Sequence, residues 1–208
     1  MYRFTAAFIF VLSLSFAGKA LASFGKDVIF SSDAGRVNLK ATISFAEYKR
    51  SGEEQYINDI EERMRSCEVS EKFIEGVKKI DRPLVLLMIG MTYCPDCKAA
   101  YPFTETASRV NPYVTARYMP RNGVTGAREF IGARAGRTNM PAIFVLRPDG
   151  KVLDGAYIET PSKVTGLIAN ATSDEERDSI WEDFHNGIYD EEIENDLLSL
   201  METALREL

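Results

Sequence analysis

The stretch MTYCPDCKAAYP, Met91 to Pro102, decides the fold, because it places two cysteines three positions apart between two patterned segments. The apolar run from Leu84 to Gly90 comes just before it and is typical of a strand that is covered on both faces. The segment from Pro95 towards Asn111 has a helical pattern. We therefore expect Cys94 at the junction of a central strand and a helix.

This position favours a reactive thiolate at Cys94. The first turn of a helix has backbone N–H groups without internal partners, and the helix dipole there favours negative charge. Pro95 suits that turn, because its missing N–H costs nothing and its φ is fixed near the helical value. Cys97 follows one turn later, close enough to form a disulfide. We expect Cys94 to be the nucleophile and Cys97 to resolve the mixed disulfide, whereas the carboxylate of Asp96 should oppose thiolate formation.

The remaining sequence predicts an α/β order with one mixed sheet. Short β-prone runs occupy residues 26–46, and two amphipathic helices follow within residues 51–80. The further expected elements are a strand over Tyr113 to Met119, a helix over Gly123 to Gly136, a hairpin with strands Ala142 to Leu146 and Lys151 to Leu153, and a helix from Pro161 to Ala169.

The last segment, Ser173 to Leu208, is strongly acidic and has apolar residues at helical spacing. This pattern predicts an amphipathic helical extension that docks on the core and leaves its acidic face in solvent. An arm that docks on a partner protein is the alternative.

The chain has 208 residues and a formal net charge of −6, which does not suggest a nucleic-acid partner. Its start resembles a signal peptide: Arg3 precedes an apolar run from Phe4 to Ala17, and small residues stand at 20 and 22. The run is shorter than the roughly 20 residues of a membrane-spanning helix. We expect cleavage after Ala22, no stable membrane anchor, and a periplasmic or secreted protein.

An exported protein enters a compartment in which disulfides persist. The chain has three cysteines, Cys67, Cys94 and Cys97, too few for a disulfide scaffold. The close pair is therefore expected to do redox work, and Cys67 is expected to be a small, partly buried thiol.

The motif resembles that of the thioredoxin superfamily. The matching residues are Tyr93, Cys94, Pro95, Cys97, Lys98 and the helix proline Pro102. The later stretch TNMPAIFVLRPDG is similar to the cis-proline loop and hairpin of the family. The resemblance covers about Leu84 to Ala169. It implies a thioredoxin-like mixed β-sheet flanked by helices, with a cis Pro141 and with Met140 contacting substrates.

The residue patterns and the resemblance together predict a domain organisation. We expect a signal peptide over residues 1–22, a thioredoxin-like domain over 23–172, and the acidic helical extension over 173–208. Within the domain we expect a helical lead-in over about 44–80 and a core over about 81–170. Two departures from the family pattern stand out: Met88 occupies the place of a buried carboxylate, and Tyr93 replaces the usual tryptophan.

These observations predict a thiol–disulfide oxidoreductase that acts on protein disulfides and exchanges electrons with a partner dithiol, with no bound cofactor. The residues Tyr93, Pro95, Met140 and Pro141 are the expected substrate contacts. The direction of electron flow is left open.

The same residues also allow other functions. Cys67, Cys94, Cys97 and His185 are a possible Cys3His zinc set, and the two motif thiols alone a possible copper ligand pair. A binding module that uses the fold for docking is the second alternative. Hydrolysis by Cys94 is disfavoured, because the sole histidine, His185, is distant in sequence.

Overall fold

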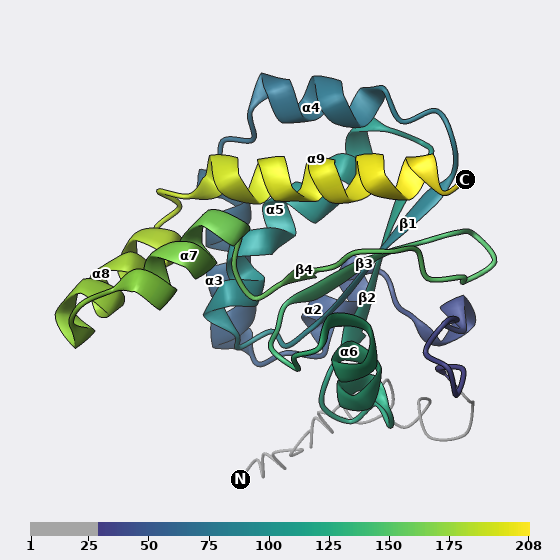
Figure 1. The fold of residues 1–208 in the computed structure, drawn as a ribbon, viewed down its shortest axis with the longest axis horizontal. Coiled ribbons are helices and arrows are strands. Elements are labelled where there is room, and N and C mark those ends of the chain that lie inside the picture. Colours follow the sequence, from purple (N-terminus) through teal and green to yellow (C-terminus); the bar gives the residue numbers. More distant parts are fainter. Residues whose placement is uncertain (1–28) are drawn as a thin grey trace, which may run out of the picture.

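The computed structural model describes residues 29–208, and its centre is a four-stranded mixed sheet in the order β2-β1-β3-β4 (Figure 1). The strands are β1 (Leu84–Gly90), β2 (Val114–Pro120), β3 (Ala142–Leu146) and β4 (Tyr157–Ile158). β1 pairs in parallel with β2 and antiparallel with β3, and β3 pairs antiparallel with β4. The predicted α/β class with one mixed sheet is confirmed.

Helices cover both faces of this sheet. They are the 3-10 helix η1 (Leu39–Ala41) and the α-helices α2 (Phe45–Arg50), α3 (Glu54–Ser66), α4 (Glu71–Lys78), α5 (Pro95–Val110), α6 (Ala127–Ala135), α7 (Ser162–Asn170), α8 (Asp174–His185) and α9 (Asp190–Arg206). Within residues 29–208, no helix is both long and apolar enough to cross a membrane. The expected signal peptide, residues 1–22, lies outside the described part of the chain.

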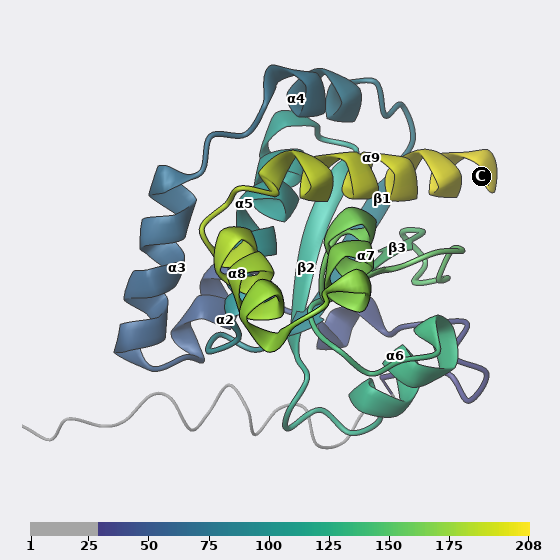
Figure 2. The ribbon, with the colours of Figure 1, turned by 60° about the vertical axis from the view of Figure 1, so that its left-hand side comes forward.

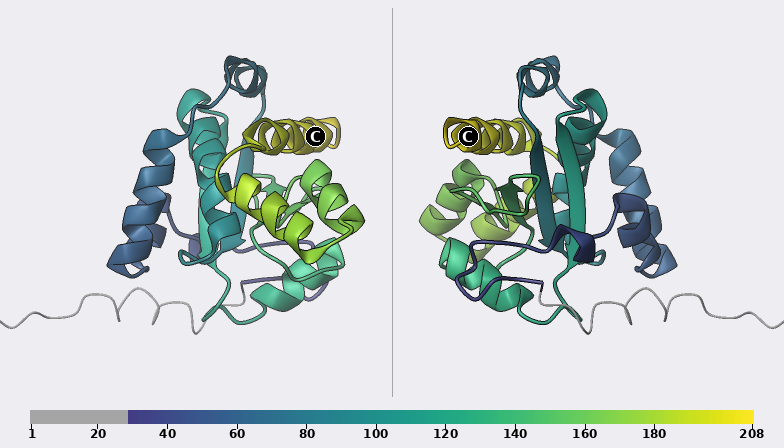
Figure 3. Two further views of the ribbon diagram at one scale, coloured as in Figure 1. Left: turned by 90° about the vertical axis from the view of Figure 1, so that its left-hand side faces the viewer. Right: turned by 90° about the vertical axis from the view of Figure 1, so that its right-hand side faces the viewer.

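β1 is buried along its whole length, as its sequence predicts. Leu84, Leu86 and Met88 belong to the apolar cluster that contains the buried residues of α5 and α9. The alternate residues face the other side of the sheet, where α6 and the segment that begins at Ile29 cover them. Figure 3 shows this segment, in purple, running past α6. The strand therefore holds α5, and with it the cysteine pair, at a fixed place against the core.

The C-terminal extension contributes directly to the core. Apolar residues of α9 are buried in the same cluster as α5: Ile193, Leu197, Leu200, Met201 and Ala204. The helix lies beside α4 and α7 (Figure 1). In addition, α8 lies next to α5 (Figure 2). These contacts bring a segment from the end of the described chain close to the cysteine motif.

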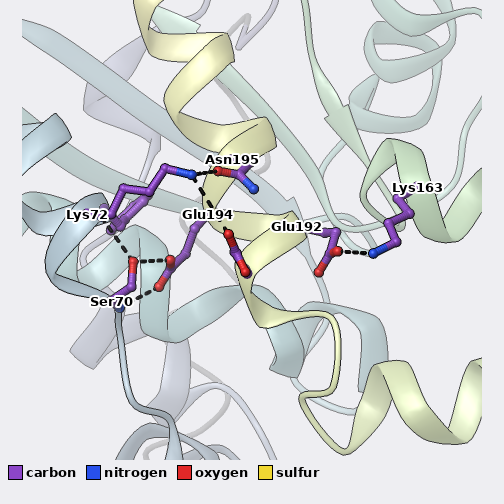
Figure 4. Close-up of polar contacts among 8 residues, drawn as sticks. Ser70, Lys72, Lys163, Glu192, Glu194 and Asn195 are labelled. Carbon is purple, nitrogen blue, oxygen red and sulfur yellow. Dashed lines mark hydrogen bonds and ion pairs between the residues drawn. The ribbon is translucent and has the colours of Figure 1, made fainter.

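The expected solvated acidic face of this extension has one exception, Glu194. Glu194 is only 3% exposed, and its carboxylate accepts hydrogen bonds from the backbone N–H of Ser70 at 2.7 Å and from the Ser70 hydroxyl (Figure 4). Ser70 is the N-cap of α4, so the carboxylate lies at the positive end of that helix. The buried charge is thus compensated by groups that the sequence pattern does not place nearby.

The second strand of the predicted hairpin is reduced to two isolated bridges: Val152 pairs with Leu146 of β3, and Lys151 pairs with Arg36. The Val152 N–H donates to Gly35, whereas the Leu153 N–H donates to Val145 of β3. The strand that extends the sheet beyond β3 is instead Tyr157–Ile158.

Two smaller differences concern the N-terminal segment and α6. The expected β-prone runs before residue 46 form isolated bridges, and η1 occupies residues for which no helix was predicted, whereas α2 falls within the expected helical lead-in over about 44–80. The helix expected from Gly123 begins only at Ala127, because Gly126 has a φ of 84° and cannot continue a helix. At its other end, Gly136 has a φ of 71° and ends the helix.

Candidate functional site

Cys94 is the N-cap residue of α5, directly after the turn that follows β1. Its sulfur accepts a hydrogen bond from the backbone N–H of Cys97 at 3.3 Å. The thiol also lies 3.8 Å from the carbonyl oxygen of Met140. The expected placement of Cys94 at the strand-to-helix junction is therefore confirmed. Its sulfur binds an N–H of the first helical turn that has no partner within the helix.

These contacts lower the pKa of Cys94. The largest cause is hydrogen bonding by the Cys97 side chain, and the Cys97 backbone N–H acts in the same direction. Burial opposes them, as does the negative charge of Asp96. The net lowering of the Cys94 pKa makes the thiolate, the reactive form of cysteine, easier to form.

Cys97 has the opposite environment. It is fully buried, and burial raises the pKa of this thiol well above its usual value, with the neighbouring Cys94 acting in the same direction. Both residues are free thiols in this structure. The two thiols of the pair thus differ in their environments, with a lowered pKa at Cys94 and a raised pKa at Cys97.

The loop before β3 lies beside the cysteines. The Met140–Pro141 peptide bond is cis, as the family resemblance implied. Pro141 is buried and Met140 is partly exposed, so Met140 offers its backbone next to Cys94 at the surface. The structure thus brings Met140 and Pro141 together with the motif from which they are separated by more than 40 positions in sequence.

Tyr93 and Pro95 are exposed on either side of Cys94. The Tyr93 side chain is 46% exposed, and its hydroxyl accepts a hydrogen bond from the Asn122 side-chain amide at 3.0 Å. Its ring also lies 6.1 Å, centroid to centroid, from that of Tyr56. Asn122 and Tyr56 were not among the predicted site residues. They border the motif only because the loop after β2 and helix α3 fold beside it.

A pair of buried phenols lies near Cys97, on the side of the sheet where Met88 stands in place of an acid. The Tyr101 hydroxyl donates a hydrogen bond to the Tyr48 hydroxyl at 2.9 Å. A Cβ on Gly90 would lie 2.7 Å from the Cys97 sulfur and 3.5 Å from the Tyr48 hydroxyl. The Tyr48 phenol therefore lies beside the end of β1 next to Cys97, and burial keeps it neutral by raising its pKa well above the usual value. Tyr48 was not among the predicted site residues, although the expected helical lead-in over about 44–80 includes it.

The sole histidine of the chain contacts the cysteine motif. His185 Nε2 lies 2.6 Å from the Oδ1 atom of Asp96, the residue before Cys97. Sequence reasoning assigned His185 to the acidic extension and did not place it here. The available signal was weak: His185 lies four residues after Trp181 and directly after Phe184, on the apolar side of its helix.

The candidate zinc ligands are not brought together. The Cys67 thiol donates a hydrogen bond to Asp190 at 3.6 Å, and burial raises its pKa to about 12. Among residues 29–208, no group of three or more His, Cys, Asp or Glu side chains could hold a metal ion. Cys67 and His185 therefore do not form a Cys3His set with the motif.

Comparison with known proteins agrees with this geometry. A family model described as thioredoxin, Thioredoxin_9, matches residues 42–175. No curated protein matches the chain. The crystal structure of PA1234, a protein of unknown function from Pseudomonas aeruginosa, superposes with a TM-score of 0.64 at 20% identity, over 79% of this chain and 94% of that chain. An HIV epitope scaffold gives the same TM-score, identity and coverage. At this identity the two structures show a shared fold, and the chain belongs to the Thioredoxin_9 family of thioredoxin-fold proteins.

Proposed function

We propose that the protein is a thiol–disulfide oxidoreductase that acts on protein disulfides through Cys94 and Cys97. The observation that carries this proposal is the difference between the two thiols. The Cys94 sulfur receives a helix N–H and has a lowered pKa, whereas Cys97 is fully buried with a raised pKa. A scaffold used only for docking has no need of this difference.

The reaction would proceed in two exchanges. The Cys94 thiolate attacks one sulfur of a substrate disulfide, which forms a mixed disulfide and releases the other substrate sulfur as a thiolate. Cys97 then loses its proton and attacks the Cys94 sulfur, which releases the second substrate sulfur. The substrate gains two electrons, and the protein is left with a Cys94–Cys97 disulfide. A partner dithiol would return the two electrons, and the same steps in reverse would oxidise a substrate.

The substrate would lie across the exposed surface that surrounds Cys94. Tyr93 offers an aromatic face on one side, and the backbone of Met140 lies on the other, held in place by the buried Pro141. An extended segment of a protein substrate could pair with such a backbone edge. We further propose that these exchanges take place in the periplasm or outside the cell, as the N-terminal sequence predicts.

The test is to trap the mixed disulfide in cells. A Cys97→Ala variant keeps the nucleophile and removes the resolving thiol, so it should accumulate substrates that are released by reductant. Cys94→Ala is the matched control and should capture none. The wild-type protein should also equilibrate with a glutathione buffer. If Cys97→Ala captures no more protein than Cys94→Ala, and wild type does not equilibrate with glutathione, the redox proposal is wrong and the docking function is favoured.

A further inference from the structure

The residue between the two cysteines is paired with a helix from the C-terminal extension. His185 on α8 and Asp96 on α5 are joined at 2.6 Å, although 89 positions separate them in sequence. The Asp96 side chain is only 17% exposed and that of His185 only 29%. The contact is thus largely shielded from solvent, which makes it stronger than the same contact on an open surface.

The surrounding residues fix the imidazole in this position. Trp181, one helical turn earlier, stacks on the His185 ring with 5.7 Å between centroids and 23° between planes. Phe184 is fully buried and anchors α8 against the core. The imidazole therefore faces α5 through packing that does not depend on its charge.

The other charged groups near His185 are already engaged or exposed. They share a polar cavity of about 270 Å³ with it and come from two helices: Asp59, Glu62 and Arg63 from α3, and Lys98 from α5. Lys98 pairs with Asp59 at 3.9 Å, and Arg63 pairs with Asp190 of α9. Glu62 is exposed, as is Glu182 on α8 itself. Of the side chains in residues 29–208, Asp96 alone forms a polar contact with the imidazole.

The carboxylate of Asp96 opposes thiolate formation in the cysteine motif. A carboxylate one residue from Cys97 and two from Cys94 disfavours a second negative charge on either sulfur. The charge of Asp96 raises the pKa of both thiols. A group that binds this carboxylate would reduce its effect on the thiolate of Cys94.

We infer that His185 is a positioning residue for the redox motif: by binding the Asp96 carboxylate from α8, it limits the repulsion between this carboxylate and the Cys94 thiolate. This inference rests on the proposed thiol–disulfide exchange and deepens it. It assigns to the acidic extension a role in setting the redox potential of the pair. A reduced form that holds its thiolate more easily makes the protein a stronger oxidant. Loss of His185 should therefore make the protein more reducing.

The experiment is a double-mutant cycle with four proteins: wild type, His185→Ala, Asp96→Asn and the double variant. Each is equilibrated with glutathione buffers, and the ratio of dithiol to disulfide is measured by alkylation and mass spectrometry. We expect His185→Ala to lower this ratio by about threefold to tenfold, the size of a charge interaction at intermediate dielectric. Asp96→Asn should raise it. In the Asp96→Asn background, removal of His185 should have at most a small effect, because its partner charge is gone.

The controls separate this inference from the proposed function. Glu182→Ala changes an exposed residue of the same helix and should leave the ratio unchanged. Far-ultraviolet circular dichroism and thermal unfolding show whether α8 stays folded. If wild type equilibrates with glutathione and His185→Ala does not change the ratio, the positioning role is wrong while the redox function stands. An equal change in both backgrounds would also overturn it. If wild type does not equilibrate at all, both proposals fail.

Discussion

The sulfur of Cys97 lies 2.7 Å from the point at which a Cβ atom would stand on Gly90, the last residue of β1. Real Cβ atoms do not approach another heavy atom so closely. A side chain at this position would displace the proposed resolving sulfur or the backbone of the central strand. The absence of a side chain at Gly90 therefore lets the strand end directly against the cysteine pair.

A Gly90→Ala substitution should slow the release of mixed disulfides and destabilise the fold by about 1–3 kcal/mol, the usual cost of overpacking a core. The measurements are urea unfolding and the rate at which Cys97 resolves a preformed mixed disulfide on Cys94. Gly166→Ala is the control, because a Cβ there meets no atom within 4 Å in the middle of α7. It should be neutral or stabilising by about 0.5–1 kcal/mol. Wild-type resolution in Gly90→Ala would contradict the proposed packing role.

The reduced protein should react with iodoacetamide first at Cys94. A free cysteine has a pKa of about 8.5, and the pKa of Cys94 is lowered, so its thiolate should persist to lower pH. The rate should fall only as the pH drops through this lowered pKa. Cys67, with its pKa raised to about 12, should stay unmodified until strongly alkaline conditions. Peptide mapping after brief alkylation at a series of pH values distinguishes the three thiols. A midpoint for Cys94 at or above the free value would refute the prediction.

The same difference predicts how the stability of the reduced protein varies with pH. Because the pKa of Cys94 is lower in the folded state, the unfolded chain binds more protons between the two pKa values. The contribution of Cys94 to the free energy of unfolding should therefore increase with pH across this interval and disappear at lower pH. Denaturant unfolding of wild type and Cys94→Ser under reducing conditions should show this as a pH-dependent gap. A gap that does not change with pH would argue against a stabilised thiolate.

Replacing Glu194 by alanine should cost about 1–3 kcal/mol, since it leaves the backbone N–H and hydroxyl of Ser70, the partly buried N-cap of α4, without their acceptor. The matched control is Glu192→Ala on the same helix, which removes the contact with the exposed Lys163 (Figure 4). That loss should be much smaller, because exposed ion pairs contribute little. Urea unfolding of both variants provides the comparison. Equal losses in the free energy of unfolding would show that the burial of Glu194 does not add to its contribution to stability.

Replacing Tyr48 by phenylalanine should destabilise the protein by about 1 kcal/mol, the typical net value of one hydrogen bond. The ring remains and its packing is kept, but the Tyr101 hydroxyl loses an acceptor at 2.9 Å. The exposed Tyr113 gives a control, Tyr113→Phe, which should be neutral. Unchanged stability in Tyr48→Phe would mean that the phenol pair adds nothing to the core.

Sequence reasoning succeeded where the signals are local. The apolar run of β1 and the helical pattern after Cys94 lie within one short stretch, so both elements and the position of Cys94 between them followed directly. The cis peptide before Pro141 was accessible only through the family resemblance. The contact between Asp96 and His185 was not accessible, because it depends on how α8 packs against α5 across 89 positions.

Two differences between prediction and structure involve partners that are distant in sequence. Residues 151–153 have a hairpin sequence and bond to β3, but they also bond to Gly35 and Arg36. Glu194 belongs to an acidic pattern that favours solvent, but the N-cap of α4 binds its carboxylate from 124 positions away. A single sequence does not identify such partners.

The burial of α9 against α4 and α5 has a consequence for biosynthesis. The ribosome makes α9 more than 70 residues after α5. Until α9 has been synthesised, the apolar residues of α4 and α5 that it buries are therefore exposed to solvent. Final compaction must wait until this late helix has emerged. During synthesis the incomplete chain would expose apolar surface that is prone to aggregation, and a chaperone can bind such a surface.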